Sequence, residues 1–291
     1  MFKLPGPISN NLIVDGDIYI YSSDEELYSV SVKGDRAPLS ATMGSLVTSI
    51  SFCEHNVLVT CVNGSKLLSA QSLKSSFFLS SSKDDSGETI AHQAGAISTS
   101  RVCIGASDGS LQFFTVEGNR CLFDDQIPPN ENGFQCMNLI GRDRLVVGRS
   151  NGEIEVWDQS SQGRWQNKSF DGFNDIPDMP VCVVGSDNVI IAGFVSGRIK
   201  IWKDELIIEA QIHGLTLTGL AMHPKTSLVA SCAEDGVLNV FEINLSSSSC
   251  PLKLIKTLCP IQTPLVGVVW HNDELSVIPF DREGIWTIRM I

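Results

Sequence analysis

A pattern of apolar and polar positions at residues 144–158, RLVVGRSNGEIEVWD, organises the whole chain. An apolar run, Leu145–Val147, leads into a Ser-Asn-Gly turn. Alternation follows, with Ile154 and Val156 predicted to point inward and Glu155 outward. Asn and Gly both tolerate the positive φ that tight hairpin turns require, so the pattern predicts a β-hairpin.

The same hairpin recurs when the chain is aligned on its turn glycine. The further copies are centred on Gly64, Gly109, Gly197, Gly236 and Gly284. Another copy without glycine, IYIYSSDEELYSVSV, lies upstream and turns near Asp24–Glu26. Seven short β-hairpins in 291 residues, with no helical stretch, are typical of a β-propeller with four-stranded blades.

The order of the β-runs predicts how the propeller closes. The last blade begins at Leu265 and reaches the end of the chain after its third strand, while Met1–Pro5 is left over at the other end. An open propeller would expose a strand edge, so we expect Met1–Pro5 to supply the missing strand. The predicted fold class is therefore an all-β, seven-bladed β-propeller of four-stranded blades. It is expected to be a single domain over residues 1–291, closed by its N-terminal strand.

These repeats resemble WD repeats over essentially the whole chain. In that family an apolar strand precedes a turn that contains aspartate, and the next strand ends in Trp-Asp. Trp157 and Asp158 match this ending fully, and Trp202 keeps the aromatic residue without the acid. Asp108 and Asp235 occupy the position of the turn aspartate.

The resemblance also implies a structural role for His213. This residue, beside Gly214, matches the Gly-His pair with which the family ties its strands. No repeat carries the family's full set of aspartate, histidine, serine and tryptophan. We therefore expect packing between strands to replace much of that network.

Charge and hydropathy narrow the range of functions. The chain has 21 Lys and Arg against 33 Asp and Glu, a net charge of −12, which disfavours a general binder of nucleic-acid backbones. Its N-terminus has no signal-peptide core, and no run approaches the ~18 apolar residues that span a bilayer. We expect an intracellular protein, cytoplasmic or nuclear, with no direct nucleic-acid partner and no membrane partner.

The nine cysteines include no C-x-x-C pair, and most lie in apolar β-runs such as Val102–Ile104. Cysteine in such runs behaves as a small hydrophobic residue. The predicted state is a set of buried free thiols in a reducing compartment.

No motif for catalysis or cofactor binding stands out. The five histidines are not spaced as metal ligands, and the chain has neither a phosphate-binding loop nor a nucleophile elbow. We therefore expect no metal, no cofactor and no small-molecule substrate. The leading hypothesis is a non-catalytic protein–protein interaction scaffold, a subunit of a larger complex. The alternative is a propeller-fold enzyme or metal-dependent hydrolase with its site at the channel mouth.

The resemblance implies that half of the turns and loops share one face, the top face, and their sequences are acidic. The candidate partner-binding residues there are Asp108, Asp171, Asp175, Asp178, Glu234 and Asp235. One hypothesis is that these carboxylates attract a basic or extended peptide of a partner protein. The other is that they are ordinary turn residues that keep the protein soluble.

Overall fold

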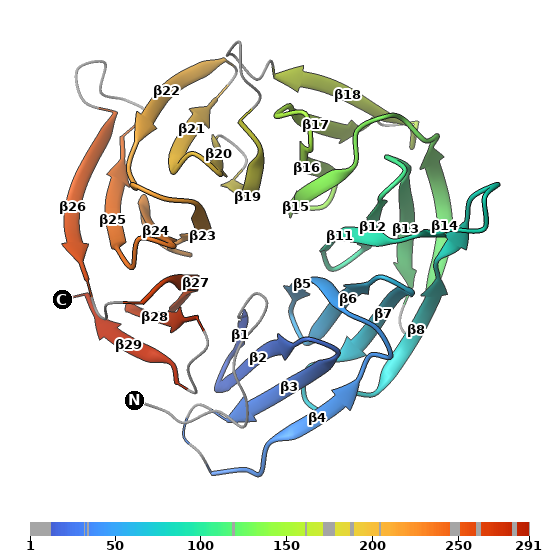
Figure 1. The fold of residues 1–291 in the computed structure, drawn as a ribbon, viewed down its shortest axis with the longest axis horizontal. Helices are drawn as coiled ribbons and strands as arrows, with labels where there is room; N and C mark the ends of the chain where they lie inside the picture. Colours follow the sequence, from blue (N-terminus) through green and yellow to red (C-terminus); the bar gives the residue numbers. More distant parts are fainter. Residues whose placement is uncertain are drawn as a thin grey trace.

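Short antiparallel sheets arranged around a central channel form the molecule (Figure 1). The structure is a computed structural model that describes residues 13–31, 33, 35–117, 120–160, 162–170, 178–186, 189–203, 205–244, 251–259, 263–280 and 284–290. These residues form 29 β-strands and contain no helix. Seven of the sheets are blades, so the predicted all-β, seven-bladed propeller is confirmed.

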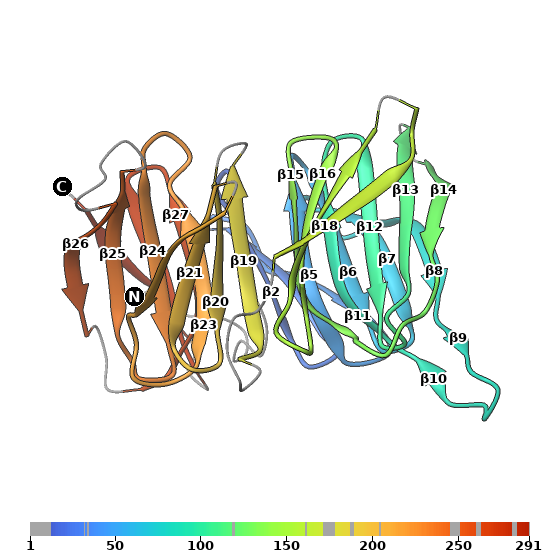
Figure 2. The same cartoon turned by 90° about the horizontal axis from the view of Figure 1, so that it is seen from above.

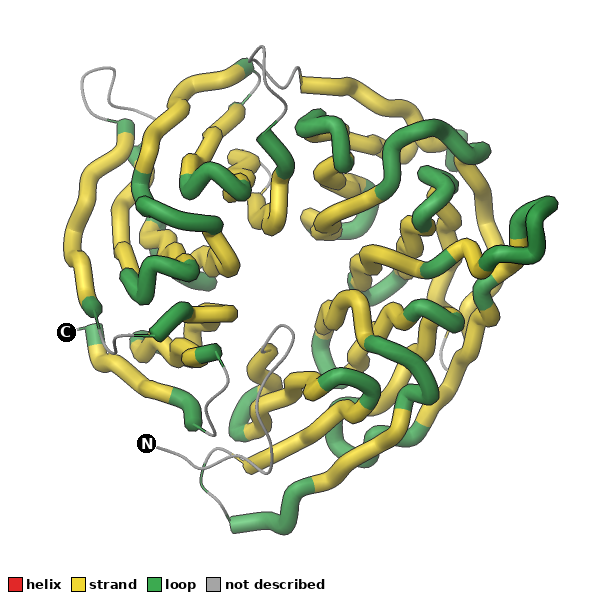
Figure 3. The backbone as a smooth tube through the Cα atoms, viewed as in Figure 1, coloured by secondary structure: helices red, strands yellow, loops and turns green. Residues whose placement is uncertain are grey.

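Within each blade the strands lie in chain order from the channel to the rim (Figure 1), and Figure 3 shows these strands in yellow and the loops that join them in green. The inner strands are β1 (Ile13–Asp15), β5 (Val47–Cys53), β11 (His92–Ile97), β15 (Phe134–Ile140), β19 (Pro180–Ser186), β23 (Leu217–Met222) and β27 (Leu265–His271). The second strands are β2 (Ile18–Ser23), β6 (Asn56–Cys61), β12 (Arg101–Ala106), β16 (Arg144–Arg149), β20 (Val189–Phe194), β24 (Leu228–Ala233) and β28 (Glu274–Pro279).

The outer half of each blade completes this order. The third strands are β3 (Glu26–Ser31), β7 (Gly64–Ser69), β13 (Leu111–Glu117), β17 (Ile154–Gln159), β21 (Arg198–Trp202), β25 (Leu238–Ile243) and β29 (Trp286–Arg289). The outer strands are β4 (Leu39–Thr42), β8 (Ser75–Ser80), β14 (Arg120–Ile127), β18 (Trp165–Phe170), β22 (Leu206–Gln211) and β26 (Leu252–Leu258). Blade 7 has three strands among the described residues, and Met1–Pro5, predicted to add the fourth, lies outside them.

The hairpins predicted from the repeat join the second and third strands of every blade. Gly109 and Gly152 have φ values of 79° and 96°, as the turn requires. Gly64 differs, because it is the first residue of β7 and pairs with Cys61 across a two-residue turn. A Cβ at Gly64 would lie 2.2 Å from the backbone oxygen of Leu79, so the close approach of the outer strand also favours glycine there.

Burial explains why the predicted alternation in the third strand is wrong at Glu155. All residues from Ile154 to Trp157 are buried, and Glu155 is only 7% exposed. The second and third strands lie between neighbouring blades, so both faces of the sheet are covered there. Each large apolar side chain fully buried in this way stabilises the fold by about 1.5–3 kcal/mol.

A small additional hairpin was not predicted. β9 (Ser82–Lys83) and β10 (Thr89–Ile90) project from the loop between blades 2 and 3 (Figure 2). Its tip is held by Asp84, whose Oδ1 accepts hydrogen bonds from the backbone N–H groups of Ser86 and Glu88. The polar composition of this stretch favoured a loop, but an aspartate-based turn is sufficient to pair its two ends.

Two faces follow from the antiparallel order. The turns between second and third strands lie on the same face as the loops that join successive blades, and we call this the top face; it points downward in Figure 2. The opposite, bottom face carries the turns between first and second strands and the loops between third and outer strands.

Six inner strands share one irregularity. A register shift, or β-bulge, follows the first residue of β5, β11, β15, β19, β23 and β27. Three of the bulged residues bond to the next blade. Thr48 Oγ1 donates to the backbone oxygen of His92 and Thr218 Oγ1 to that of Leu265, each at 2.7 Å. The side-chain oxygen of Gln93 accepts from the backbone N–H of Phe134 at 3.1 Å. The bulges thus help to join neighbouring inner strands.

Candidate functional site

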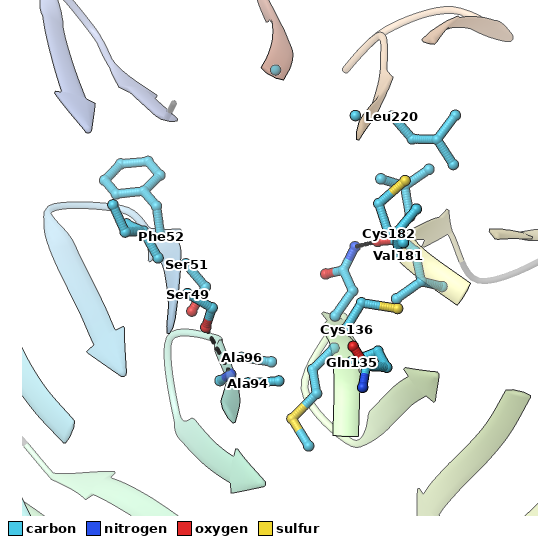
Figure 4. A pocket seen from close by; sticks show the side chains of 18 of the residues that line it. Ser49, Ser51, Phe52, Ala94, Ala96, Gln135, Cys136, Val181, Cys182 and Leu220 are labelled. Carbon is cyan, nitrogen blue, oxygen red and sulfur yellow. Dashed lines mark hydrogen bonds between the residues drawn. The ribbon is translucent and has the colours of Figure 1, made fainter. Parts of the chain in front are cut away.

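The central channel encloses about 380 Å³ and is lined by the inner strands (Figure 4). Its lining mixes polar side chains such as Ser51 and Gln135 with apolar ones such as Phe52. Part of its polar lining joins neighbouring strands, because Ser49 Oγ accepts from the Gly95 N–H at 3.0 Å. A channel of this size and composition is a candidate site, but the described residues that line it include no acid–base pair.

Two thiols, Cys136 and Cys182, also line the channel (Figure 4). Burial raises the pKa of Cys136 to about 12 and that of Cys182 well above its ordinary value. A thiol, unlike a thiolate, is a weak nucleophile and metal ligand. These two groups therefore act as small apolar side chains of the wall.

Three of the four predicted partner-binding acids that the structure describes are engaged in turns or loops. Asp108 Oδ1 accepts from the backbone N–H of Ser110 at 2.9 Å, and Asp178 Oδ1 accepts from that of Ser196 at 3.1 Å. Asp235 accepts from the backbone N–H groups of Gly214 and Val237. These bonds belong to the turns, and Asp108, Asp178 and Asp235 lie in three different blades.

Glu234 is the exception, because it is exposed in the β24–β25 turn beside Asp235. Asp171 and Asp175, predicted as partner-binding residues, lie outside the described residues. The top face also carries apolar side chains that sequence reasoning missed, and each lies in a turn or loop. They are Leu46, Val195, Leu215 and Phe280, between 38% and 55% exposed.

His213 ties blade 6 together at its top edge. His213 Nδ1 lies 3.2 Å from Asp235 Oδ2, and Nε2 lies 2.9 Å from Ser231 Oγ. A carboxylate can only accept, so we assign the ring proton to Nδ1 and the accepting role to Nε2. Burial lowers the pKa of His213, although Asp235 opposes the shift, so the ring is neutral. Asp235 also accepts from the N–H groups of Gly214 and Val237, both at 2.9 Å.

In blade 4, a buried ion pair lies at the interface with blade 3. Arg149 Nη2 lies 3.0 Å from Glu155 Oε2, and Trp157 Nε1 donates to the same oxygen at 2.9 Å. The guanidinium carbon lies 3.9 Å from the ring centroid of Phe134. Arg149 Nη1 donates to the backbone oxygens of Gly109 and Asn132, at 3.2 and 2.9 Å, so the cation also joins blade 4 to blade 3.

The two remaining residues of the predicted structural set have different environments. Trp202 is buried, with its ring 6.0 Å from that of Phe170 in the preceding blade. Asp158 is exposed and pairs with Arg144, whose Nε lies 2.7 Å from Asp158 Oδ1. An exposed pair of this kind contributes at most about 1 kcal/mol.

Sequence reasoning missed a second structural histidine, which joins two neighbouring blades. His92, at the start of β11, lies 2.7 Å through Nδ1 from Ser65 Oγ of the preceding blade. Burial lowers its pKa to about 4, so it too is neutral near pH 7. Its place just before an apolar strand was the available signal, but no spacing rule connects it to Ser65.

Comparison with known proteins gives a match in structure only. No family model matches the chain, and no curated protein matches it in sequence. The solved structure titled "Structure of U3-55K" superposes with a TM-score of 0.81 at 13% identity, covering 98% of this chain and 96% of that one. The structure of RRP9 WD40 repeats superposes at 0.80 with 12% identity, covering 99% of each chain. The chain has the WD40-repeat propeller fold.

Two further solved structures superpose on this chain. A chain of the Mitotic Checkpoint Complex matches at a TM-score of 0.79 and 12% identity, covering 99% of this chain and 90% of that one. The computationally designed Ika8 protein matches at 0.66 and 16% identity, covering 98% of each chain. Since natural and designed chains share the fold, the fold by itself assigns no activity.

In this WD40-type propeller, the described residues hold no group of three or more His, Cys, Asp or Glu side chains that could bind a metal ion. Across the same part of the chain, no helix is long and apolar enough to cross a membrane.

Proposed function

We propose that this propeller is a non-catalytic interaction scaffold, a subunit of a larger protein complex that recruits partners through its top face. The observation that carries the proposal is the composition of that face. That face carries both exposed apolar side chains, such as Leu215 and Phe280, and exposed carboxylates, such as Glu234. Contiguous exposed apolar and charged groups are typical of protein-binding surfaces.

The charge of the top face indicates what kind of partner it suits. Among the described residues its exposed acids include Asp24, Glu25, Asp84, Asp85, Glu88, Glu131 and Glu234. Clustered carboxylates around a channel focus negative potential and accelerate the approach of a basic partner. We therefore infer a partner with a basic, extended segment.

The environment of the titratable groups supports a non-catalytic role. Both His92 and His213 are buried, and each is hydrogen bonded to a serine of the scaffold. The channel thiols of Cys136 and Cys182 have raised pKa values. Stoichiometric metal in the purified protein, measured by elemental analysis, would instead favour the alternative of a metal-dependent hydrolase.

Charge reversal tests the top face directly. The variant carries Glu25→Lys, Glu131→Lys and Glu234→Lys, and the matched control carries Glu54→Lys, Glu117→Lys and Glu205→Lys on the bottom face. All six glutamates are exposed, so both variants change the net charge equally and neither disturbs the core. A further variant, Asp171→Lys with Asp175→Lys, covers the two predicted acids outside the described residues.

The readout is purification of tagged protein from its own cells with mass spectrometry, in low and in moderate salt. We expect stoichiometric partners that are retained by the control, lost from the top-face variant and weakened by salt. Equal recovery with both variants would exclude the top-face carboxylates as the binding determinant. Recovery of the protein alone would contradict the scaffold itself.

A further inference from the structure

A groove of about 670 Å³ opens between blades 5 and 6 on the side of the propeller. One wall is formed by Ala210 and Ile212, at the end of blade 5, and the other by Leu252 and Leu254 of β26. Phe241 of β25 contributes to the floor. This surface is separate from the exposed top-face acids on which the proposed function depends.

The strand register shows which residues of blade 4 correspond to the residues of the groove. Trp157 lies five residues after the turn glycine Gly152, and Phe241 lies five residues after Gly236. On the neighbouring outer strand, Trp165 pairs with Gln159, two residues beyond Trp157. Leu252 pairs in the same way with Ile243, two residues beyond Phe241. Blade 6 therefore has phenylalanine and leucine where blade 4 has two tryptophans.

The wall of the groove that blade 5 forms also carries a smaller side chain than its counterpart in blade 4. In blade 4, Phe170 pairs with Ile154 and lies 6.0 Å, between ring centroids, from Trp202 of blade 5. In blade 5, the equivalent pairing joins Ile199 to Ala210. An alanine thus faces blade 6 at the position from which a phenylalanine faces blade 5.

At the interface between blades 3 and 4, aromatic rings fill this region. Trp165 stacks on Phe113 of the preceding blade with ring centroids 4.2 Å apart, and Trp157 lies 6.5 Å from the same ring. The chain therefore places aromatic rings at the positions that are smaller between blades 5 and 6. The groove results from the absence of these rings, so its shape suits a ring supplied from outside.

Polar groups in the groove are already satisfied within the chain. Asn239 Nδ2 donates to the backbone oxygen of Ile212 at 2.8 Å, and its Oδ1 accepts from Thr257 Oγ1 at 2.7 Å. An apolar ring can cover this amide without leaving a polar atom unpaired. In the wall formed by β26, Leu254 is 61% exposed, and apolar surface of this kind favours binding.

We propose that the groove between blades 5 and 6 binds an extended segment of a partner protein and takes one aromatic side chain of that segment against Phe241. The groove has the volume of a ligand site for more than a single ring. β22 and β26 are the outermost strands of their sheets, so their edges present main-chain groups with which an extended chain can pair.

Purified protein with labelled Ile, Leu and Val methyl groups provides a direct test by NMR. The probes are the tripeptide Ac-Ser-Trp-Ser-NH2, its alanine counterpart Ac-Ser-Ala-Ser-NH2, and N-acetyltryptophanamide. We expect saturable shifts of the Ile212, Leu252 and Leu254 methyl groups with the tryptophan tripeptide. The alanine peptide should cause no saturable shift.

Two variants locate the binding. Ala210→Phe places in the groove the ring that blade 4 has at the equivalent position, and should weaken binding by about tenfold or more. Glu209→Phe is its control, because the neighbouring side chain of a strand points to the opposite face and leaves the groove open. Leu254→Asp removes an exposed apolar wall without touching the core and should also weaken binding, which keeps the test decisive if Ala210→Phe does not fold.

Unchanged binding to Ala210→Phe or to Leu254→Asp, in proteins that melt normally, would overturn the proposal. Equal affinity for N-acetyltryptophanamide and the tripeptide would also overturn it, and would indicate a small aromatic ligand in place of a peptide. Because the test uses no cellular partner, its failure leaves the top-face proposal standing, and the reverse is also true.

Discussion

The interfaces of blade 4 with blade 3 and of blade 6 with blade 5 are built from equivalent strands but differ in chemistry. The first contains a buried ion pair, Arg149 with Glu155, and closely packed rings. The second contains a tie through a neutral histidine, His213 with Asp235 and Ser231, and smaller side chains that leave a groove. The blade framework therefore fixes neither the polar tie nor the filling of the space beside it, and the two can vary separately.

The largest effect on stability is expected when the cation of blade 4 is removed. Arg149→Met leaves the Glu155 carboxylate buried, with the Trp157 N–H as its only hydrogen-bond donor among the described residues. We expect the free energy of unfolding to fall by about 3–5 kcal/mol, measured by urea denaturation. The double variant with Glu155→Gln should recover part of this loss. If it recovers nothing, packing of Arg149 on Phe134 outweighs the ion pair.

Removing the histidine tie of blade 6 should lower the free energy of unfolding by less than removing the ion pair of blade 4. Asp235→Ala removes the acceptor of His213 and of the Gly214 and Val237 N–H groups, but leaves no buried charge behind. We expect a loss of about 1–3 kcal/mol in the same urea experiment. Asp158→Ala, at an exposed pair, is the matched control and should cost at most about 1 kcal/mol. A larger loss from Asp235→Ala than from Arg149→Met would reverse the ranking of the two interfaces.

The two histidine ties should make the stability of the protein depend on pH in the acid range. His92 has a folded-state pKa of about 4, below its ordinary value of 6.5, so the unfolded chain binds its proton more readily. Its contribution to stability is therefore complete above pH 6.5 and is lost as the pH falls toward 4. His213 acts in the same direction. The melting temperature should fall over this range, and His92→Gln should flatten the slope; an unchanged slope would show that His92 does not determine it.

The smallest effect is expected at the interface between blades 4 and 5. Lys200 is 2% exposed, its ammonium lies 5.1 Å from the Phe194 ring centroid, and no carboxylate among the described residues forms an ion pair with it. Lys200→Met keeps the volume and removes the charge, so stability should rise by about 1 kcal/mol. Thermal melting measures this, and a fall would reveal a counter-charge outside the described residues.

Much of the fold was predictable because a hairpin is a local structure. The turn glycines Gly109 and Gly152, with the apolar runs beside them, are sufficient to locate the second and third strands of a blade. The prediction was wrong at Glu155 because alternation assumes one solvent-exposed face, and the neighbouring blade covers both. The closure by Met1–Pro5 remains a prediction.

The candidate site was less predictable because it depends on contacts between blades. The family resemblance placed His213 and Asp235 in structural positions, and the structure brings them together with Ser231. Nothing in the sequence connects Arg149 to Glu155 more strongly than to another acid. The groove depends on Ala210 and Leu252 facing each other across two blades, and that requires the strand register.

The bulges of the inner strands have a consequence for the order of folding. The hydroxyl of Thr48 binds the first residue of the next inner strand, and that of Thr218 does the same for β27. Each link points forward along the chain, so a completed blade presents a prepared acceptor or donor to the one made after it. A chain emerging from the ribosome can therefore add its blades one at a time, each on the edge of its predecessor, well before the ring closes.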